Sequence, residues 1–104
     1  YSITDALAII HTHPPYATLL SMTHEELTPI DMEGMYFFEK IPVICIDKKT
    51  GSFNTTQIMC EILKDYPIVL VRGHGSFARG KNLEEAFMYT SSLESSAFFI
   101  YHAK

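Results

Sequence analysis

Ile10-His11-Thr12-His13-Pro14-Pro15 is the stretch of this sequence that decides its fold. It closes the run 6–11, which is apolar on both faces and predicts a central strand. Side chains at positions i and i+2 of a strand point to the same face, so the two imidazoles are expected to project side by side. Two adjacent imidazoles are typical of one half of a metal site.

A third histidine, His74, lies in Gly73-His74-Gly75, directly after another buried-strand run at 67–71. The flanking glycines allow unusual backbone angles and a close approach of metal or substrate. We therefore predict that two strand ends bring His11, His13 and His74 to one metal ion. Three imidazoles with an open fourth position are typical of catalytic rather than structural zinc, although cobalt, nickel and copper also suit them.

Hydrophobic periodicity, capping residues and prolines predict an α/β domain. A helix is expected to follow the prolines at 16–22, and a short helix at 31–38. Asn54 with Gln57, and Asn82 with Glu85, form capping-box patterns that open two further helices. The predicted strands are 6–11, 41–46, 68–71 and 76–79, with an extended segment at 28–30 and a turn at 47–51 whose Gly51 has positive φ.

Composition excludes several classes of protein. The 104 residues are 47% hydrophobic and 19% charged, which is typical of one globular domain. A net charge of −4 without a basic stripe argues against nucleic acid, and the apolar runs are too short to span a membrane. Cys45 and Cys60 lie in apolar patterns and are expected to be buried, reduced thiols of a cytoplasmic protein.

The two remaining histidines have simpler explanations than metal binding. His24 lies in a polar segment and His102 near the end of the last predicted helix. A histidine near a helix C-terminus is favourable as a capping or solvated residue. The chain also starts on a central strand without an initiator Met, so we expect an N-terminal portion to be missing.

Three motifs together resemble the class II aldolase/adducin family, especially its L-fuculose-1-phosphate aldolases and L-ribulose-5-phosphate 4-epimerases. They are Ile9–Thr18, Val69–Gly75 and Asn82–Phe87. The resemblance covers the whole chain but about the second half of the family's domain, so residues 1–104 are expected to be its C-terminal part. It implies a three-layer α/β/α sandwich with a central mixed, largely antiparallel sheet.

The same resemblance implies a function and its partners. It implies a homotetrameric lyase of carbohydrate metabolism, with Zn²⁺ or another divalent transition metal held by His11, His13 and His74. The expected reaction is aldol cleavage of a small ketose phosphate, such as L-fuculose 1-phosphate, through a metal-stabilised enediolate. The family's glutamate base and phosphate-binding loops belong to its first half, so no catalytic residue is assigned here.

Three alternatives stay open. Family aldolases use a tyrosine where this chain has Asp31, Met32 and Glu33, with Tyr36 nearby, whereas related methylthioribulose-phosphate dehydratases carry a glutamate. Glu33 either matches that glutamate, which implies a dehydratase or 4-epimerase, or is a solvated carboxylate at a helix start. The second alternative is a non-catalytic, adducin-like interaction module, and the third is a fragment without independent function.

Overall fold

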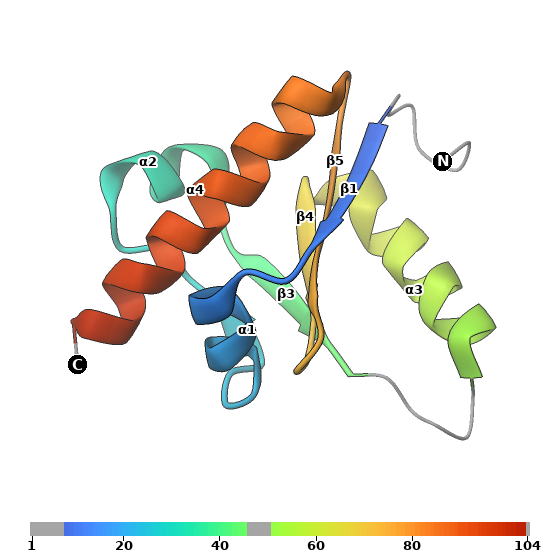
Figure 1. Cartoon of the computed structure of the whole chain (residues 1–104), viewed down its shortest axis with the longest axis horizontal. Coiled ribbons are helices and arrows are strands. Elements are labelled where there is room, and N and C mark those ends of the chain that lie inside the picture. The colour runs from blue at the N-terminus through green and yellow to red at the C-terminus, as the bar shows by residue number, and fades with distance from the viewer. Residues whose placement is uncertain (1–7, 46–50, 104) are drawn as a thin grey trace.

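The computed structural model describes residues 8–45 and 51–103, which form one sheet between two layers of helices (Figure 1). In chain order, the elements are β1 (Ala8–Thr12), α1 (Pro15–Ser21), β2 (Glu26–Leu27), α2 (Met32–Phe37), β3 (Ile41–Ile44), α3 (Gly51–Asp65), β4 (Ile68–Val71), β5 (Gly75–Gly80) and α4 (Leu83–His102). The predicted three-layer α/β/α architecture is confirmed.

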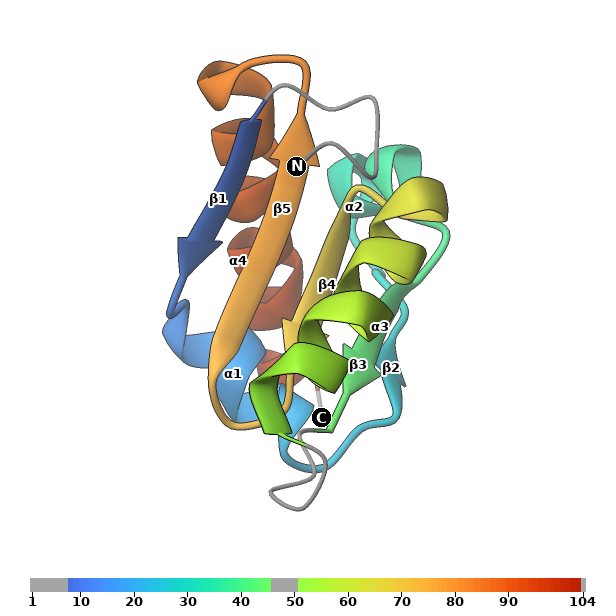
Figure 2. The same ribbon diagram turned by 90° about the vertical axis from the view of Figure 1, so that its right-hand side faces the viewer.

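The sheet is mixed and mostly antiparallel, as predicted. Its strand order is β1-β5-β4-β3-β2; β3 and β4 are parallel, and the other neighbours are antiparallel. Parallel neighbours require a crossover, and α3 provides it on one face of the sheet. The helices α1, α2 and α4 lie on the opposite face (Figure 1). Since α3 packs mainly beside β4, none of the described helices covers most of β1 on the α3 side (Figure 2).

The core lies between the sheet and α4. All four residues of β4 are buried, and Leu70 belongs to one cluster with Leu93 and Ala97 of α4. Small side chains let this helix approach the sheet closely. A Cβ added to Gly80 would lie 2.6 Å from the backbone nitrogen of Ala86, so a larger residue there would push the start of α4 away.

The predicted N-cap of α4 is confirmed. The side chain of Asn82 accepts a hydrogen bond of 2.8 Å from the backbone N–H of Glu85. The Glu85 carboxylate accepts one of 2.8 Å from the N–H of Lys81, one residue earlier than an ideal capping box places it. These two bonds give the N–H groups of Glu85 and Lys81 acceptors at this helix start.

Several predicted details differ from the structure. The extended segment after α1 is Glu26–Leu27 rather than 28–30, because these residues pair with Pro42 and Ile41 of β3. Helix α3 begins at Gly51, so Asn54 does not cap it. Of the turn predicted at 47–51, residues 47–50 lie outside the described residues, and Gly51 belongs to the helix. A cap contributes about 1 kcal/mol, too little to decide a helix boundary alone.

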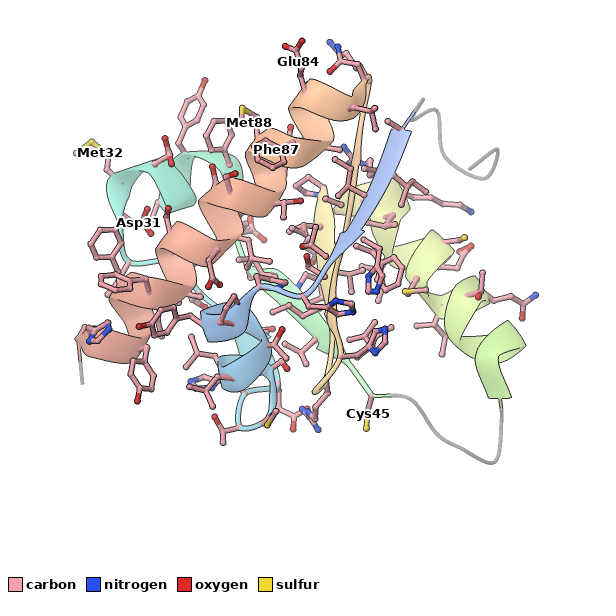
Figure 3. The ribbon with its side chains drawn as sticks, viewed as in Figure 1. Asp31, Met32, Cys45, Glu84, Phe87 and Met88 are labelled. Carbon is pink, nitrogen blue, oxygen red and sulfur yellow. The ribbon has the colours of Figure 1, made fainter. Side chains whose placement is uncertain are left out.

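Burial also departs from expectation in two places. Ile58, whose helical spacing with Met59, Ile62 and Leu63 predicts burial, is 41% exposed, because α3 covers only part of its sheet face. Cys45 was predicted to be buried but is exposed just beyond β3, and Cys60 is half-buried (Figure 3). None of the helices in the described part of the chain is long and apolar enough to cross a membrane.

Replacing Asn82 by alanine is expected to lower the free energy of unfolding of the full-length protein by about 1 kcal/mol, because the N–H of Glu85 loses its acceptor. Urea unfolding measures this loss. Asn82→Ser is the matched control, since serine caps equally well and should leave the unfolding midpoint unchanged. Equal stability of the alanine and serine variants would contradict this account of the helix start.

Candidate metal centre

His11 projects from β1 onto the α3 face of the sheet. Its neighbour Ile10 packs against the core on the α4 face, and successive strand residues alternate between faces. His11 is paired across the sheet with Phe77 of β5. The two rings lie nearly parallel, 16° apart, with centroids 4.1 Å apart. This cross-strand stacking fixes one side of the imidazole against an apolar surface.

A hydrogen bond determines the tautomer of His11. Its Nδ1 lies 3.0 Å from the carbonyl oxygen of Ser76. A carbonyl can only accept, so Nδ1 carries the proton and the lone pair of Nε2 is free to bind a metal ion. Backbone carbonyl partners of this kind orient metal-binding histidines in many proteins.

His13 is held by the chain that follows it. Pro14 is extended (φ −69°, ψ 127°) and is the N-cap of α1, and Pro15 occupies the first helical turn, as predicted. The carboxylate of Glu94 on α4 accepts hydrogen bonds of 2.9 Å from the N–H groups of both Tyr16 and Ala17. The start of α1 is therefore anchored to α4, and the position of His13 is fixed relative to the core.

His74 lies in the tight turn between β4 and β5. Its N–H donates a 2.9 Å hydrogen bond to the carbonyl of Val71, and Gly73 has φ +70°, a conformation that favours glycine. Gly75 is needed for a different reason. A Cβ at Gly75 would overlap the carbonyl oxygen of Thr12 and lie 2.9 Å from Cδ2 of His13. Absence of that side chain lets the two histidine-bearing segments meet.

The structure brings His11, His13 and His74 together, as predicted. Their ring centroids are 4.7, 5.0 and 5.3 Å apart, and one ring nitrogen from each lies within 4.8 Å of the others. Tetrahedral zinc with Zn–N bonds of about 2.05 Å needs nitrogens about 3.3 Å apart, so small side-chain rotations suffice. Within the described residues, no cysteine, aspartate or glutamate joins this cluster.

The cluster is open to solvent. All three histidines are exposed, and no helix of residues 8–45 or 51–103 covers the sheet face around them (Figure 2). Three neutral imidazoles with an accessible fourth position suit a divalent metal that also contacts substrate, whereas a structural site is closed by a fourth protein ligand. The donor set and the geometry therefore fit a catalytic type of metal centre.

Glu33 lies apart from the cluster. It is exposed in the first turn of α2, which packs against α4 on the opposite side of the sheet from α3 (Figure 1). The hydroxyl of Ser92 on α4 donates to its carboxylate at 3.4 Å. Figure 3 shows the neighbouring Met32 pointing outward from α2. Within one chain, Glu33 therefore does not reach the three histidines.

The other two histidines lie elsewhere. His24 donates from Nδ1 to the carbonyl of Leu20, 3.0 Å away, and so caps the end of α1 as predicted. His102 packs against the ring of Phe98 at the end of α4. Sequence reasoning missed the roles of Ser76 and Glu94, because neither carries a local signal and both act across long sequence separations.

Comparison with known proteins gives the family. Residues 1–101 match the family model described as "Class II Aldolase and Adducin N-terminal domain". The chain belongs to the class II aldolase and adducin family. Class II aldolases are generally dependent on a divalent metal, which agrees with the donor set found here.

The structural and sequence relatives agree with this family. A crystal structure of L-fuculose-1-phosphate aldolase from Thermus thermophilus superposes with a TM-score of 0.91 at 32% identity, covering 99% of this chain and 56% of that one. The L-fuculose phosphate aldolase of Methanocaldococcus jannaschii is 30% identical over 93 residues, covering 89% of this chain and 50% of that protein. The methylthioribulose-1-phosphate dehydratase of Debaryomyces hansenii is 26% identical, covering 90% and 46%. The chain thus spans about half the length of the curated relatives it matches.

Gly75→Ala is expected to destabilise the full-length protein by about 1–3 kcal/mol, because the new methyl group overlaps the Thr12 carbonyl and forces β1 and β5 apart. Thermal unfolding measures the change. Gly73→Asn is the control: no atom lies within 4 Å of a Cβ there, and asparagine tolerates positive φ. Gly75→Ala with wild-type stability would show that the close approach of the strands is unimportant.

Proposed function

We propose that the full-length protein is a metal-dependent lyase that cleaves a small ketose phosphate, with L-fuculose 1-phosphate as the leading candidate. The observation that carries this proposal is the convergence of His11, His13 and His74 at an exposed strand end. The similarity to two L-fuculose phosphate aldolases, at 30% and 32% identity, supports the choice of reaction. Zinc is the first candidate for the metal, because three imidazoles with an open fourth position are typical of catalytic zinc sites.

A divalent ion held by the three imidazoles would supply a Lewis acid for the carbonyl and hydroxyl oxygens of the substrate. The protein's own contribution is orientation. The Ser76 carbonyl holds His11 in the tautomer that exposes Nε2, and the prolines and Glu94 fix His13. Preorganised ligands of this kind avoid reorganisation during the reaction.

Aldol cleavage also needs a group that removes a proton from the substrate hydroxyl, and we propose that it lies outside the described residues. As that proton leaves, the carbon–carbon bond breaks to give an aldehyde and the enediolate of the smaller fragment, which takes up a proton on carbon to become a ketone phosphate. In the described part of the chain no carboxylate joins the histidine cluster, and Glu33 lies on the opposite side of the sheet. We expect the base to come from the remainder of the protein or from a neighbouring subunit.

Dehydration of a sugar phosphate is the second candidate. It is favoured by the similarity to methylthioribulose-1-phosphate dehydratases, which match 90% of the chain at 26% identity. Both reactions develop negative charge next to a carbonyl group that a metal would polarise, but aldol cleavage begins with loss of a hydroxyl proton and dehydration with loss of a proton from the carbon beside the carbonyl. Aldol cleavage then breaks a carbon–carbon bond, whereas dehydration breaks a carbon–oxygen bond and releases water, so the products distinguish the two reactions.

Metal binding is the first test. The purified full-length protein is expected to hold about one equivalent of zinc per chain, and replacing any one of His11, His13 or His74 by alanine should lower its affinity at least tenfold, since one of three ligands is lost. Metal analysis and chelator competition measure this. His24→Ala is the control, because that ring caps α1 instead. Less than about a tenth of an equivalent in wild type would favour an adducin-like interaction module.

Substrate turnover is the second test. L-Fuculose 1-phosphate is expected to release an aldehyde and a ketone phosphate, whereas methylthioribulose 1-phosphate should be unchanged. Glu33→Gln is expected to keep aldolase turnover within about twofold, because Glu33 lies on the opposite side of the sheet from the three histidines. Loss of a true general base would instead lower turnover about a hundredfold or more. Dehydration that disappears in Glu33→Gln would replace the aldolase proposal by the dehydratase one.

A further inference from the structure

Arg72 is the first residue of the turn that carries His74, yet its side chain lies on the α1 and α4 face of the sheet, opposite the face of His11. Leu70, two residues earlier, packs in the core on the α1 and α4 side, and strand alternation places Arg72 on that side too. The guanidinium reaches the end of α1. Its Nε donates to the carbonyl of Ser21 at 2.9 Å, and Nη2 donates to the carbonyl of His24 at 3.1 Å.

These contacts are favourable for two physical reasons. The last carbonyls of a helix lack partners within the helix, and a cation beside them interacts well with the negative end of the helix. The further ion pair of Arg72 with Glu25, at 3.5 Å, adds little because the Glu25 side chain is 94% exposed. The bonds to backbone carbonyls, rather than the ion pair, therefore anchor Arg72 to α1.

Ser21 makes a second connection to the same turn. Its hydroxyl donates to the carbonyl of Thr18 at 2.6 Å and accepts a 3.0 Å hydrogen bond from the N–H of Gly73. Ser21 is fully buried, so water does not replace either partner. Gly73 is adjacent to His74 and has the positive φ that shapes the turn. The serine hydroxyl thus fixes the backbone immediately before the third histidine.

We propose that Ser21 and Arg72 are positioning residues that hold His74 at the distance from His13 that metal binding requires. Helix α1 begins two residues after His13 and ends at Ser21, so it is a rigid spacer between the two histidine-bearing segments. Without the side chains of Ser21 and Arg72, the turn is held by the His74–Val71 hydrogen bond, by the 2.8 Å bond from the N–H of Arg72 to the carbonyl of Ile44, and by β-pairing. This inference rests on the proposed metal centre.

The experiment uses two variants of the full-length protein, Arg72→Ala and Ser21→Ala, and two measurements. In metal-free protein, amide hydrogen exchange of Gly73 and His74 should become about tenfold faster, because their turn opens more often. Titration with Co²⁺, followed by its visible absorption, should show affinity lowered about tenfold or more, the range found for residues that orient metal ligands.

Arg79→Ala is the matched control. Arg79 also donates from Nε to a backbone carbonyl, that of Leu63 at 2.8 Å, but it connects the far end of β5 to α3. Its loss should lower stability without changing Co²⁺ affinity or exchange at Gly73. The conservative Arg72→Lys variant keeps the charge but not both hydrogen bonds, so intermediate affinity is expected.

The outcomes separate this inference from the proposed function. Wild-type protein that does not bind Co²⁺ overturns the metal centre and, with it, the positioning role. Wild-type binding together with unchanged affinity in Ser21→Ala and Arg72→Ala overturns the positioning role alone. Should Arg72→Ala fail to fold, Ser21→Ala decides, since it removes one hydroxyl and leaves the packing of α1 intact.

Discussion

The antiparallel register between β1 and β5 is the constraint on which the histidine cluster depends. It sets His11 opposite Phe77 and Thr12 opposite Ser76. The hydroxyls of Thr12 and Ser76 bond at 3.0 Å on the core side, and Gly75 lets the Thr12 carbonyl approach closely. A shift of one residue would turn every side chain of β1 to the other face, placing His11 in the core and Ile10 in solvent. The chemistry of the site therefore depends on strand pairing as much as on the histidines themselves.

Local patterns in the sequence predicted much of this arrangement. The paired histidines at the end of an apolar strand, the helix after two prolines and the Asn82 cap are all encoded within a few residues, and all are found. The interactions that orient the site were not predicted. Ser76 supplies a backbone carbonyl that any residue could offer, and Glu94 and Arg72 act across 48 to 78 residues of sequence. Such contacts depend on the tertiary fold, which periodicity does not specify.

Exposed apolar residues reveal a second limit of periodicity. The apolar residues of α4 keep helical spacing, but they divide between two faces of the helix. Ala86, Leu93 and Ala97 are buried, while Leu83 and Phe87 are exposed. Phe87 points outward from α4 in Figure 3. Apolar residues at helical spacing can occupy more than one face, and which face meets the sheet is decided by size: the small alanines allow close packing that phenylalanine would prevent.

Helix α1 connects three parts of the molecule that sequence separates widely. Its first N–H groups bind Glu94 of α4, its last residue binds the turn before His74, and it follows His13 directly. A helix of seven residues has little intrinsic stability, so these contacts at its two ends must supply what its own hydrogen bonds do not. The same contacts that stabilise α1 consequently fix two of the three imidazoles. The stability of this helix and the geometry of the site are therefore coupled, because movement of either end of α1 would displace a histidine.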